Sequence, residues 1–324
     1  MRLKKKINEL LHPLSNVRKL LNEFKSDFFN LQNGLASKEF IRTQYLQEKV
    51  LNSRELGISS NKVCEYEVVV SLTTHGVRIY DVYLAIESIM QGTVKPNRLV
   101  LWLSEDEFND NDLPVTLKNQ ISRGLEVLFC KDVRSFTKLI PSLRKFPESC
   151  IITIDDDIIY DFDLVERLVT SHKLNPDKVC SNRIHKMKLG DDYMPISYMK
   201  WDWCVNDYSI DKLNFLTGVG GVLYPPHVFT QEVFNESVFL DICKYADDVW
   251  FNAMLLLNNV DIIKSYTRST IGEDYLGIEG VQYLGLCYAN TNETDCRNDV
   301  QIRDVWEMYK INQLLQDKMH KSLL

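Results

Sequence analysis

Three consecutive carboxylates, Asp155, Asp156 and Asp157, directly follow an apolar run that ends at Ile154. In one interpretation they form a solvated turn whose last member caps the next helix, because aspartate is favoured in turns and at helix N-termini. In the other they bind a divalent cation, since adjacent carboxylates repel one another unless a cation neutralises them. Such hard oxygen ligands suit Mg²⁺ or Mn²⁺, which bind one or two carboxylates together with substrate phosphates. The triplet alone leaves both interpretations open.

Two further segments carry residues with chemical potential. Asp247 and Asp248 begin the apolar run "VWFNAMLLL", where the simpler interpretation makes one of them a helix N-cap. The segment "LTGVGGVLYPP" contains Gly220 and Gly221, but it is not a dinucleotide-binding fingerprint, because its two prolines prevent a helix from following at once. Its glycines more simply allow the backbone to approach a ligand.

The elements that must position these residues alternate between strand and helix from residue 66 onward. Apolar patterns predict strands over residues 66–75, 98–105, 125–132 and 149–157, and helices over residues 79–93, 114–124 and 135–146. Such alternation implies an α/β fold with a mostly parallel sheet and right-handed crossovers. In sheets of this kind, ligands bind outside the carboxyl ends of the strands. The acidic triplet falls at that edge.

Six segments, taken in order, resemble a bacterial nucleotide-sugar glycosyltransferase with the GT-A fold. They are "VVVSLTTHGVRI", "AIESIMQGTVKPNRLVLWLSE", "VRSFTKLIPSL", "ITIDDDIIY", "LTGVGGVLYPP" and "ADDVWFNAMLL". The first half is similar to family 2 transferases, and the order of triplet, glycine-rich strand and acidic pair also resembles the β-1,3-galactosyltransferase and Fringe group. The resemblance covers residues 66–310 and implies a GT-A-like, Rossmann-type sheet flanked by helices.

The resemblance also implies roles for individual residues. Asp157, the last residue of a DxD motif, would bind Mn²⁺ or Mg²⁺ at the donor diphosphate, and Asp155 would lie near the ribose or a metal-bound water. Asp248 matches the position of the catalytic base in inverting relatives, with Asp247 beside it. The residues expected at the donor are Thr73, Arg78, Lys138, Asp155, Asp156, Gly220 and Gly221. Many GT-A enzymes add a C-terminal histidine ligand, but only His320 follows Asp248, so we expect Asp157, phosphates and water to hold the metal.

These roles define an expected function. It is a metal-dependent glycosyltransferase of the hexosyltransferase type that moves a sugar, with inversion, from a nucleotide-sugar to an acceptor hydroxyl. A UDP-sugar is the first candidate donor, and the acceptor would belong to a cell-surface polysaccharide, such as a capsule or O-antigen, or to a lipid-linked glycan. One alternative is a nucleotidyl or sugar-phosphate transferase, for which "LTTHGVRIYD" lacks the glycine-rich loop. Another is a non-catalytic sugar-binding scaffold, which would not need Asp155, Asp157 and Asp248 intact.

Residues 1–62 differ from the rest in their pattern of apolar and basic residues and are predicted to form an amphipathic helical extension. A GT-A-like domain over residues 63–312 and a C-terminal helix end or tail over residues 313–324 follow. Apolar residues recur every three or four positions between Ile7 and Leu31, as in a coiled-coil seam. The same segment is basic, which favours contact with an anionic membrane surface. Homo-oligomerisation, peripheral membrane contact and packing on the chain's own domain all stay open.

The totals exclude several classes of protein. The formal net charge of −7 argues against general nucleic-acid binding, which needs a basic surface. No stretch approaches the ~18 apolar residues of a membrane span, and polar residues interrupt any signal-peptide core. We expect a cytoplasmic protein that reaches the inner face of the plasma membrane only peripherally. The eight cysteines lack a C-x-x-C pair or zinc-type spacing, which predicts reduced packing residues.

Overall fold

The computed structural model describes residues 37–269, 274–278 and 296–322, together with Lys25 and Gly34. The chain divides into two compact units, Met1–Glu48 and Lys49–Leu324. A helix covers residues 37–52. The apolar seam between residues 7 and 31 lies outside the described residues, so the oligomer and the membrane contact stay predictions.

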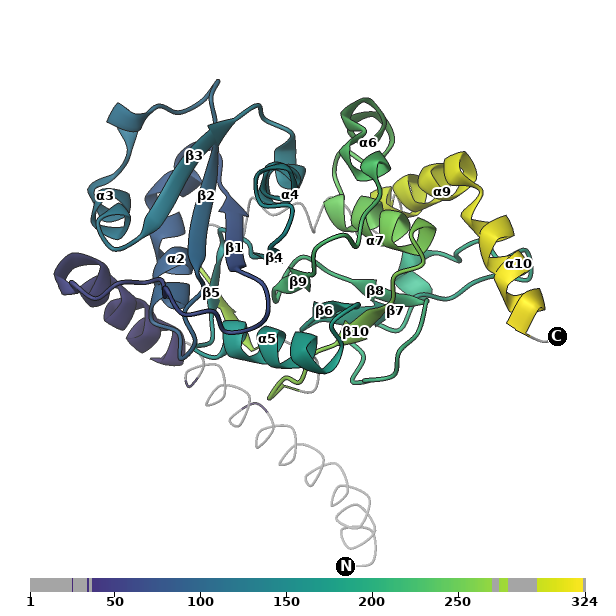
Figure 1. Ribbon diagram of the computed structural model, residues 1–324, viewed down its shortest axis with the longest axis horizontal. Helices are drawn as coiled ribbons and strands as arrows, with labels where there is room; N and C mark the ends of the chain where they lie inside the picture. The colour runs from purple at the N-terminus through teal and green to yellow at the C-terminus, as the bar shows by residue number, and fades with distance from the viewer. Residues whose placement is uncertain (1–24, 26–33, 35–36, 270–273, 279–295, 323–324) are drawn as a thin grey trace, which may run out of the picture. The chain divides into compact units, whose positions relative to one another are not determined.

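The second unit is built around a seven-stranded sheet (Figure 1). In spatial order its strands are β10 (Ile262–Lys264), β6 (Val179–Ser181), β9 (Val222–Tyr224), β4 (Cys150–Thr153), β1 (Val68–Thr73), β2 (Arg98–Ser104) and β3 (Leu125–Cys130). Neighbouring strands are parallel except at β9, which is antiparallel to both β4 and β6. The predicted α/β class with a mostly parallel sheet is confirmed, and it agrees with the GT-A-like sheet that the resemblance implied.

Further helices and two two-stranded sheets occupy the rest of the described part of this unit. The α-helices are α2 (Val82–Met90), α3 (Val115–Ile121), α4 (Ile140–Lys145), α5 (Leu164–Leu174), α6 (Glu236–Ile242), α7 (Asp247–Leu257), α9 (Arg297–Tyr309) and α10 (Ile311–Ser322). The 3₁₀ helices are η1 (Gly76–Tyr80), η2 (Asp110–Asp112), η3 (Arg134–Lys138), η4 (Tyr198–Lys200) and η5 (Gln231–Phe234). Antiparallel pairs join β5 (Ile158–Tyr160) to β11 (Tyr275–Gly277) and β7 (Ile184–Lys186) to β8 (Asn214–Leu216). Among the described helices, none has the length and apolar character that a membrane crossing requires.

The two faces of the central sheet are buried under different helices. Val69, Val100, Ile151 and Val222, one from each of four adjacent strands, share one buried cluster with residues of α4, α7 and α9. Successive residues of a strand point to opposite faces, so the residues between them face the other side. The buried residues of α2, α3 and α5 lie outside that cluster, and these helices cover the second face (Figure 1). Burial on both faces explains why these strands are almost wholly apolar.

The helix predicted over residues 135–146 is interrupted. The 3₁₀ helix η3 ends at Lys138, and α4 begins at Ile140. Pro141 in the first turn of α4 explains the break, because proline has no N–H to donate to a preceding turn. The hydroxyl of Ser71 in β1 donates to the backbone oxygen of Lys138 at 2.6 Å. This bond fixes the Lys138 backbone against the first strand of the sheet.

Candidate active site

The acidic triplet lies at the carboxyl edge of the sheet. Asp155 follows β4, and Asp156 and Asp157 form the turn between β4 and β5. Because β9 runs antiparallel to β4, with Val222 opposite Thr153, the turn that precedes β9 is brought to the same edge. The glycine-rich segment and the triplet therefore meet, although they are far apart in the sequence.

Lys138 joins the triplet to the second acidic pair. Its Nζ lies 2.8 Å from Oδ1 of Asp155 and 3.2 Å from Oδ2 of Asp247, and the residue is only 8% exposed. Burial by itself would lower the pKa of Lys138, but the charges and hydrogen bonds of the two aspartates raise that pKa well above its ordinary value. A charged lysine therefore holds the end of β4 and the start of α7 together.

Glycines make room for this bridge. A Cβ atom at Gly218 would lie 2.8 Å from Nζ of Lys138, so the ammonium group would have to move from its position between the two aspartates. Gly220 and Gly221 have φ angles of +99° and +91°, which side-chain-bearing residues rarely adopt. The backbone oxygen of Gly220 accepts a hydrogen bond from Nδ2 of Asn182 at 2.8 Å. The local backbone conformation and the nearby lysine thus explain why glycines occupy these positions. Their predicted contact with a sugar donor stays a prediction.

Asp156 anchors the first loop rather than facing solvent. Its Oδ2 accepts a hydrogen bond from the hydroxyl of Thr74 at 2.6 Å, and its Oδ1 accepts one from Nη1 of Arg78 at 2.8 Å. The residue is 6% exposed, so both carboxylate oxygens are engaged within the protein. Sequence reasoning missed Thr74, and its position beside Thr73 in the loop after β1 was the available signal.

The other donor residues predicted in the first loop are partly brought together. Nη1 of Arg78 also lies 3.5 Å from Oδ2 of Asp157, so this arginine touches two members of the triplet. The hydroxyl of Thr73 instead donates to the backbone oxygen of Trp102 in β2 at 3.0 Å. The structure places Arg78 at the triplet, while Thr73 ties β1 to β2.

Asp157 is the triplet member with the least compensated charge. Burial, followed by the charges of Asp155 and Asp156, raises the pKa of Asp157 to about 6, although Arg78 lowers it. A divalent cation would relieve this repulsion, and carboxylate oxygens are the ligands that Mg²⁺ and Mn²⁺ prefer. Among the described residues, the aspartates do not bring three ligand atoms within 4.8 Å of one another. These carboxylate ligands therefore fit a metal ion that is held by one or two carboxylates together with other oxygen atoms, which is how Mg²⁺ usually binds.

Asp248 lies in the first turn of α7 and has a raised pKa. Helix α7 begins at Asp247, and Ala246 occupies the N-cap position without a side-chain cap bond, so neither aspartate is the N-cap residue. Oδ1 of Asp248 accepts a hydrogen bond from the N–H of Val249 at 2.9 Å, which orients the carboxylate. Asp248 is enclosed by protein but keeps partial exposure. Burial and the charge of Asp247 raise its pKa to about 7, against a smaller opposing effect of Lys138.

Loss of the lysine bridge should cost considerable stability. Lys138→Met leaves Asp155 and Asp247 without their cation, so we expect the free energy of unfolding at pH 8 to fall by about 3–5 kcal/mol. The loss should be smaller at pH 5, because the stranded carboxylates then take up protons more readily. Urea unfolding at the two pH values measures both quantities.

Lys131→Met is the matched control for this measurement. Lys131 pairs with Glu236 at 3.1 Å, but its side chain is 72% exposed, so its loss should cost less than ~1 kcal/mol. Equal losses for the two variants would show that Lys138 does not form a buried bridge.

Comparisons with known proteins find similarity among solved structures, one of which is a mannosyltransferase. No protein-family model matches the chain, and no curated protein matches it either. Among solved structures, the mannosyltransferase PcManGT from Pyrobaculum calidifontis, in complex with GDP-Man and Mn²⁺, is similar with 11% sequence identity and a TM-score of 0.40. The similarity covers 71% of this chain and 64% of the mannosyltransferase, so the chain spans just under two thirds of that protein's length. The α/β fold assignment therefore stands on the strand order and register described above.

Proposed function

We propose that this protein is a metal-dependent, hexosyltransferase-type glycosyltransferase that moves a sugar from a nucleotide-sugar to an acceptor hydroxyl. One observation carries the proposal: Lys138 bridges Asp155 and Asp247, and so unites a candidate metal site and a candidate base at the carboxyl edge of the sheet. In α/β sheets this edge is where ligands bind. The order of the sequence motifs, which resembles GT-A transferases, supports the same assignment.

The two acidic clusters divide the work. Asp157, assisted by Asp155, would hold Mn²⁺ or Mg²⁺, and such an ion would supply positive charge that stabilises a departing diphosphate. Asp248 accepts the proton of the acceptor hydroxyl as its oxygen attacks the anomeric carbon. Asp247 is paired with Lys138. That pairing supports Asp248 as the base, and a single base with direct attack gives inversion of configuration.

We extend the proposal to the donor and the acceptor. We assign donor contacts to the region of Thr73, Arg78, Lys138, Asp155, Asp156, Gly220 and Gly221. Asp156 and Lys138 already bind other protein groups. Their proposed role is therefore to hold in place the loops that contact the donor. A UDP-sugar is the first candidate donor, and a cell-surface polysaccharide or lipid-linked glycan is the proposed acceptor. Such an acceptor would place the enzyme in the cytoplasm, at the inner face of the plasma membrane, where the basic N-terminal segment would dock or oligomerise.

Ligand-induced stabilisation tests the proposal directly. A ligand that binds only the folded state raises the melting temperature, so UDP-, GDP-, CMP- and TDP-sugars are compared with and without Mn²⁺. We expect one nucleotide class to raise the melting temperature only when Mn²⁺ is present. Stabilisation by a nucleoside triphosphate and not by any nucleotide-sugar would point to nucleotidyl transfer instead. Binding without transfer to any hydroxyl acceptor would leave a sugar-binding scaffold.

The pH dependence of transfer should report the base. Because Asp248 must be ionised to accept a proton and its pKa is raised to about 7, kcat/KM should rise with pH through about 7 and then level off. Asp247→Asn removes the neighbouring charge that raises this pKa. The rising limb should therefore move to lower pH in that variant, with a milder loss of rate than at Asp248. A profile that is flat between pH 5 and 8, or that does not move in the variant, would contradict the assignment of Asp248.

A further inference from the structure

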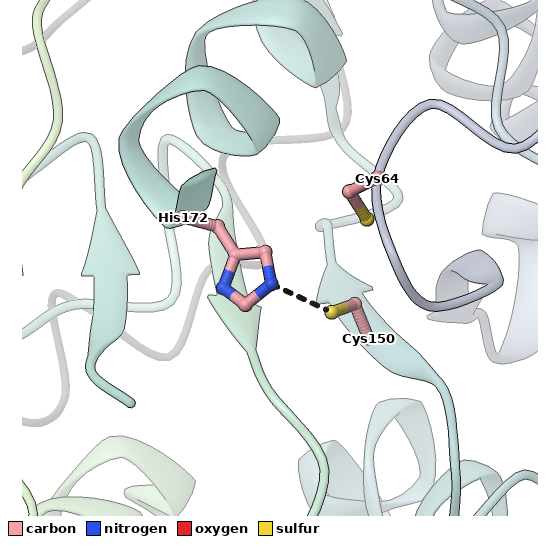
Figure 2. Close-up of side chains that lie close together, drawn as sticks. All are labelled: Cys64, Cys150 and His172. Carbon is pink, nitrogen blue, oxygen red and sulfur yellow. Dashed lines mark hydrogen bonds between the residues drawn. The ribbon is translucent and has the colours of Figure 1, made fainter. Parts of the chain in front are cut away.

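Two cysteines and a histidine from distant parts of the sequence converge at the opposite edge of the sheet. Cys64 lies just before β1, Cys150 is the first residue of β4, and His172 lies in the last turn of α5. Figure 2 shows the three side chains directed toward one another. One ligand atom from each residue lies within 4.8 Å of the other two. The cluster is thus at the amino end of β4, whereas the aspartate site is at its carboxyl end.

The geometry of this cluster is close to that of a tetrahedral metal site. With Zn–S bonds of about 2.3 Å and Zn–N bonds of about 2.0–2.1 Å, tetrahedral angles place neighbouring ligand atoms about 3.5–3.8 Å apart. The distance between Sγ of Cys150 and Nε2 of His172 is 3.5 Å. Because no pair of ligand atoms is more than 4.8 Å apart, a small movement of Cys64 would complete three corners of the tetrahedron.

Burial and bonding around the histidine also point to a ligand. His172 is 2% exposed and Cys150 is fully buried, so both are fixed in place. Nδ1 of His172 has no hydrogen-bond partner among the described residues, and Nε2 has only the weak contact with sulfur. A metal bond at Nε2 would replace this weak contact with a stronger interaction, while Nδ1 would keep its present surroundings.

Access and charge favour a cation at the same point. Cys64 is half-buried, which leaves a route for an ion from solvent. The carboxylate of the adjacent Glu65 is near enough to act electrostatically on both His172 and Cys150. Glu65 is exposed, and its carboxylate is not among the ligand atoms that lie within 4.8 Å of one another, so a water molecule is the candidate for the fourth position. Thiolate and imidazole are soft or borderline ligands, unlike the carboxylates of the aspartate site.

We propose that Cys64, Cys150 and His172 bind a thiophilic divalent cation, with Zn²⁺ the best match, at the amino-terminal edge of the central sheet. The site is structural: it ties the segment before β1 to the start of β4 and to the end of α5. The backbone already makes one such link, because the N–H of Cys150 donates to the oxygen of Glu67 at 2.9 Å. This site is independent of the proposed Mn²⁺ or Mg²⁺ site, from which it differs in both ligand chemistry and position.

Cobalt titration tests the proposal without any enzyme assay. The full-length protein is purified under reducing conditions, freed of metal by a chelator and titrated with Co²⁺, whose absorption spectrum reports thiolate bonding and tetrahedral geometry. We expect about one Co²⁺ per chain with thiolate charge-transfer bands, and we expect Zn²⁺ to abolish those bands. Zn²⁺ should also raise the melting temperature of the metal-free protein.

Matched variants separate this site from the other thiols and from the aspartates. Cys64→Ser removes one of the three proposed ligands but keeps a hydroxyl that can donate to the backbone oxygen of Tyr66, as the thiol does. The substitution should weaken Co²⁺ binding by more than the ~10–100-fold typical of losing an outer-shell partner. Cys130→Ser removes a thiol outside the cluster and should bind as wild type. Asp157→Asn should keep the thiolate bands, because the carboxylate is not a ligand here.

Three results would overturn the proposal. The first is the absence of thiolate bands at saturating Co²⁺ in folded, reduced protein. The second is equal Co²⁺ affinity of Cys64→Ser and wild type. The third is a Cys64–Cys150 disulfide in protein whose thiols were alkylated at cell lysis, since that bond would occupy both sulfur ligands.

Discussion

Asparagine in place of Asp248 is expected to lower the rate of sugar transfer by ~10²–10⁴-fold, the usual contribution of a positioned general base. The amide has the size of the carboxylate and still accepts the hydrogen bond from the Val249 N–H, but it takes up no proton at neutral pH. Donor binding should change little, because Asp248 is not among the proposed donor contacts, and Lys138 pairs with Asp155 and Asp247 rather than with Asp248. Initial rates with a fixed acceptor, together with the donor-induced melting shift, measure the two quantities separately.

The stability of the same variant distinguishes a lost base from a damaged fold. The pKa of Asp248 is raised from 3.8 to about 7, so the folded state binds this proton more tightly than the unfolded chain. Ionisation of Asp248 therefore costs stability as the pH rises from 3.8 to about 7, and the full cost remains above that. Asp248→Asn removes the cost, and its melting temperature at pH 8 should be at least that of wild type. Transfer at a near-normal rate in this variant would assign the base to another group.

The layered architecture could be predicted from the sequence because burial on both faces leaves a strong pattern. The predicted strands over residues 98–105 and 125–132 correspond to β2 and β3, and the carboxyl edge follows from the parallel order. The position of β9 could not be predicted in this way. It is three residues long and antiparallel within a parallel sheet, and so short a strand carries almost no periodicity.

The candidate site was predictable in its residue types but not in its pairings. The triplet and the acidic pair stand out as like charges beside apolar runs. That Asp156 binds Thr74 and Arg78, while Asp155 and Asp247 share Lys138, depends on loops that only the fold brings together. The interruption of the helix at Pro141 decides where Lys138 lies, but the pattern of apolar residues does not reveal this interruption.

The cysteines are a further case in which the sequence does not reveal which distant residues meet. Their sequence spacing gives no zinc signature, and we predicted reduced packing residues from it. Cys64, Cys150 and His172 nevertheless meet, because the loop before β1, the start of β4 and the end of α5 lie at one edge of the sheet. A ligand set assembled from three separate elements leaves no local motif in the sequence.

Asparagine in place of Asp157 is expected to abolish the Mn²⁺-dependent part of donor binding while the protein stays folded. Removing one of the two proposed carboxylate ligands would leave the site with too little negative charge to hold a divalent cation. Burial and the neighbouring aspartates raise the pKa of Asp157 to about 6, so its ionised form costs stability at neutral pH. The metal-free variant should therefore melt at or above the wild-type temperature at pH 8, where wild type carries the ionised carboxylate.

Asp156 provides the control, because its carboxylate is hydrogen-bonded within the protein, whereas that of Asp157 is poorly compensated. Asp156 is satisfied by Thr74 and Arg78, so Asp156→Asn should lower the melting temperature by weakening those bonds. The melting experiment is run with and without donor and Mn²⁺. In the metal-free protein, Asp157→Asn should leave the melting temperature unchanged or raise it, whereas Asp156→Asn should lower it. If Asp157→Asn keeps the full Mn²⁺-dependent shift with donor, the metal is bound elsewhere. If both variants are equally destabilised, the triplet is a structural turn, and the simpler interpretation of its three carboxylates is correct.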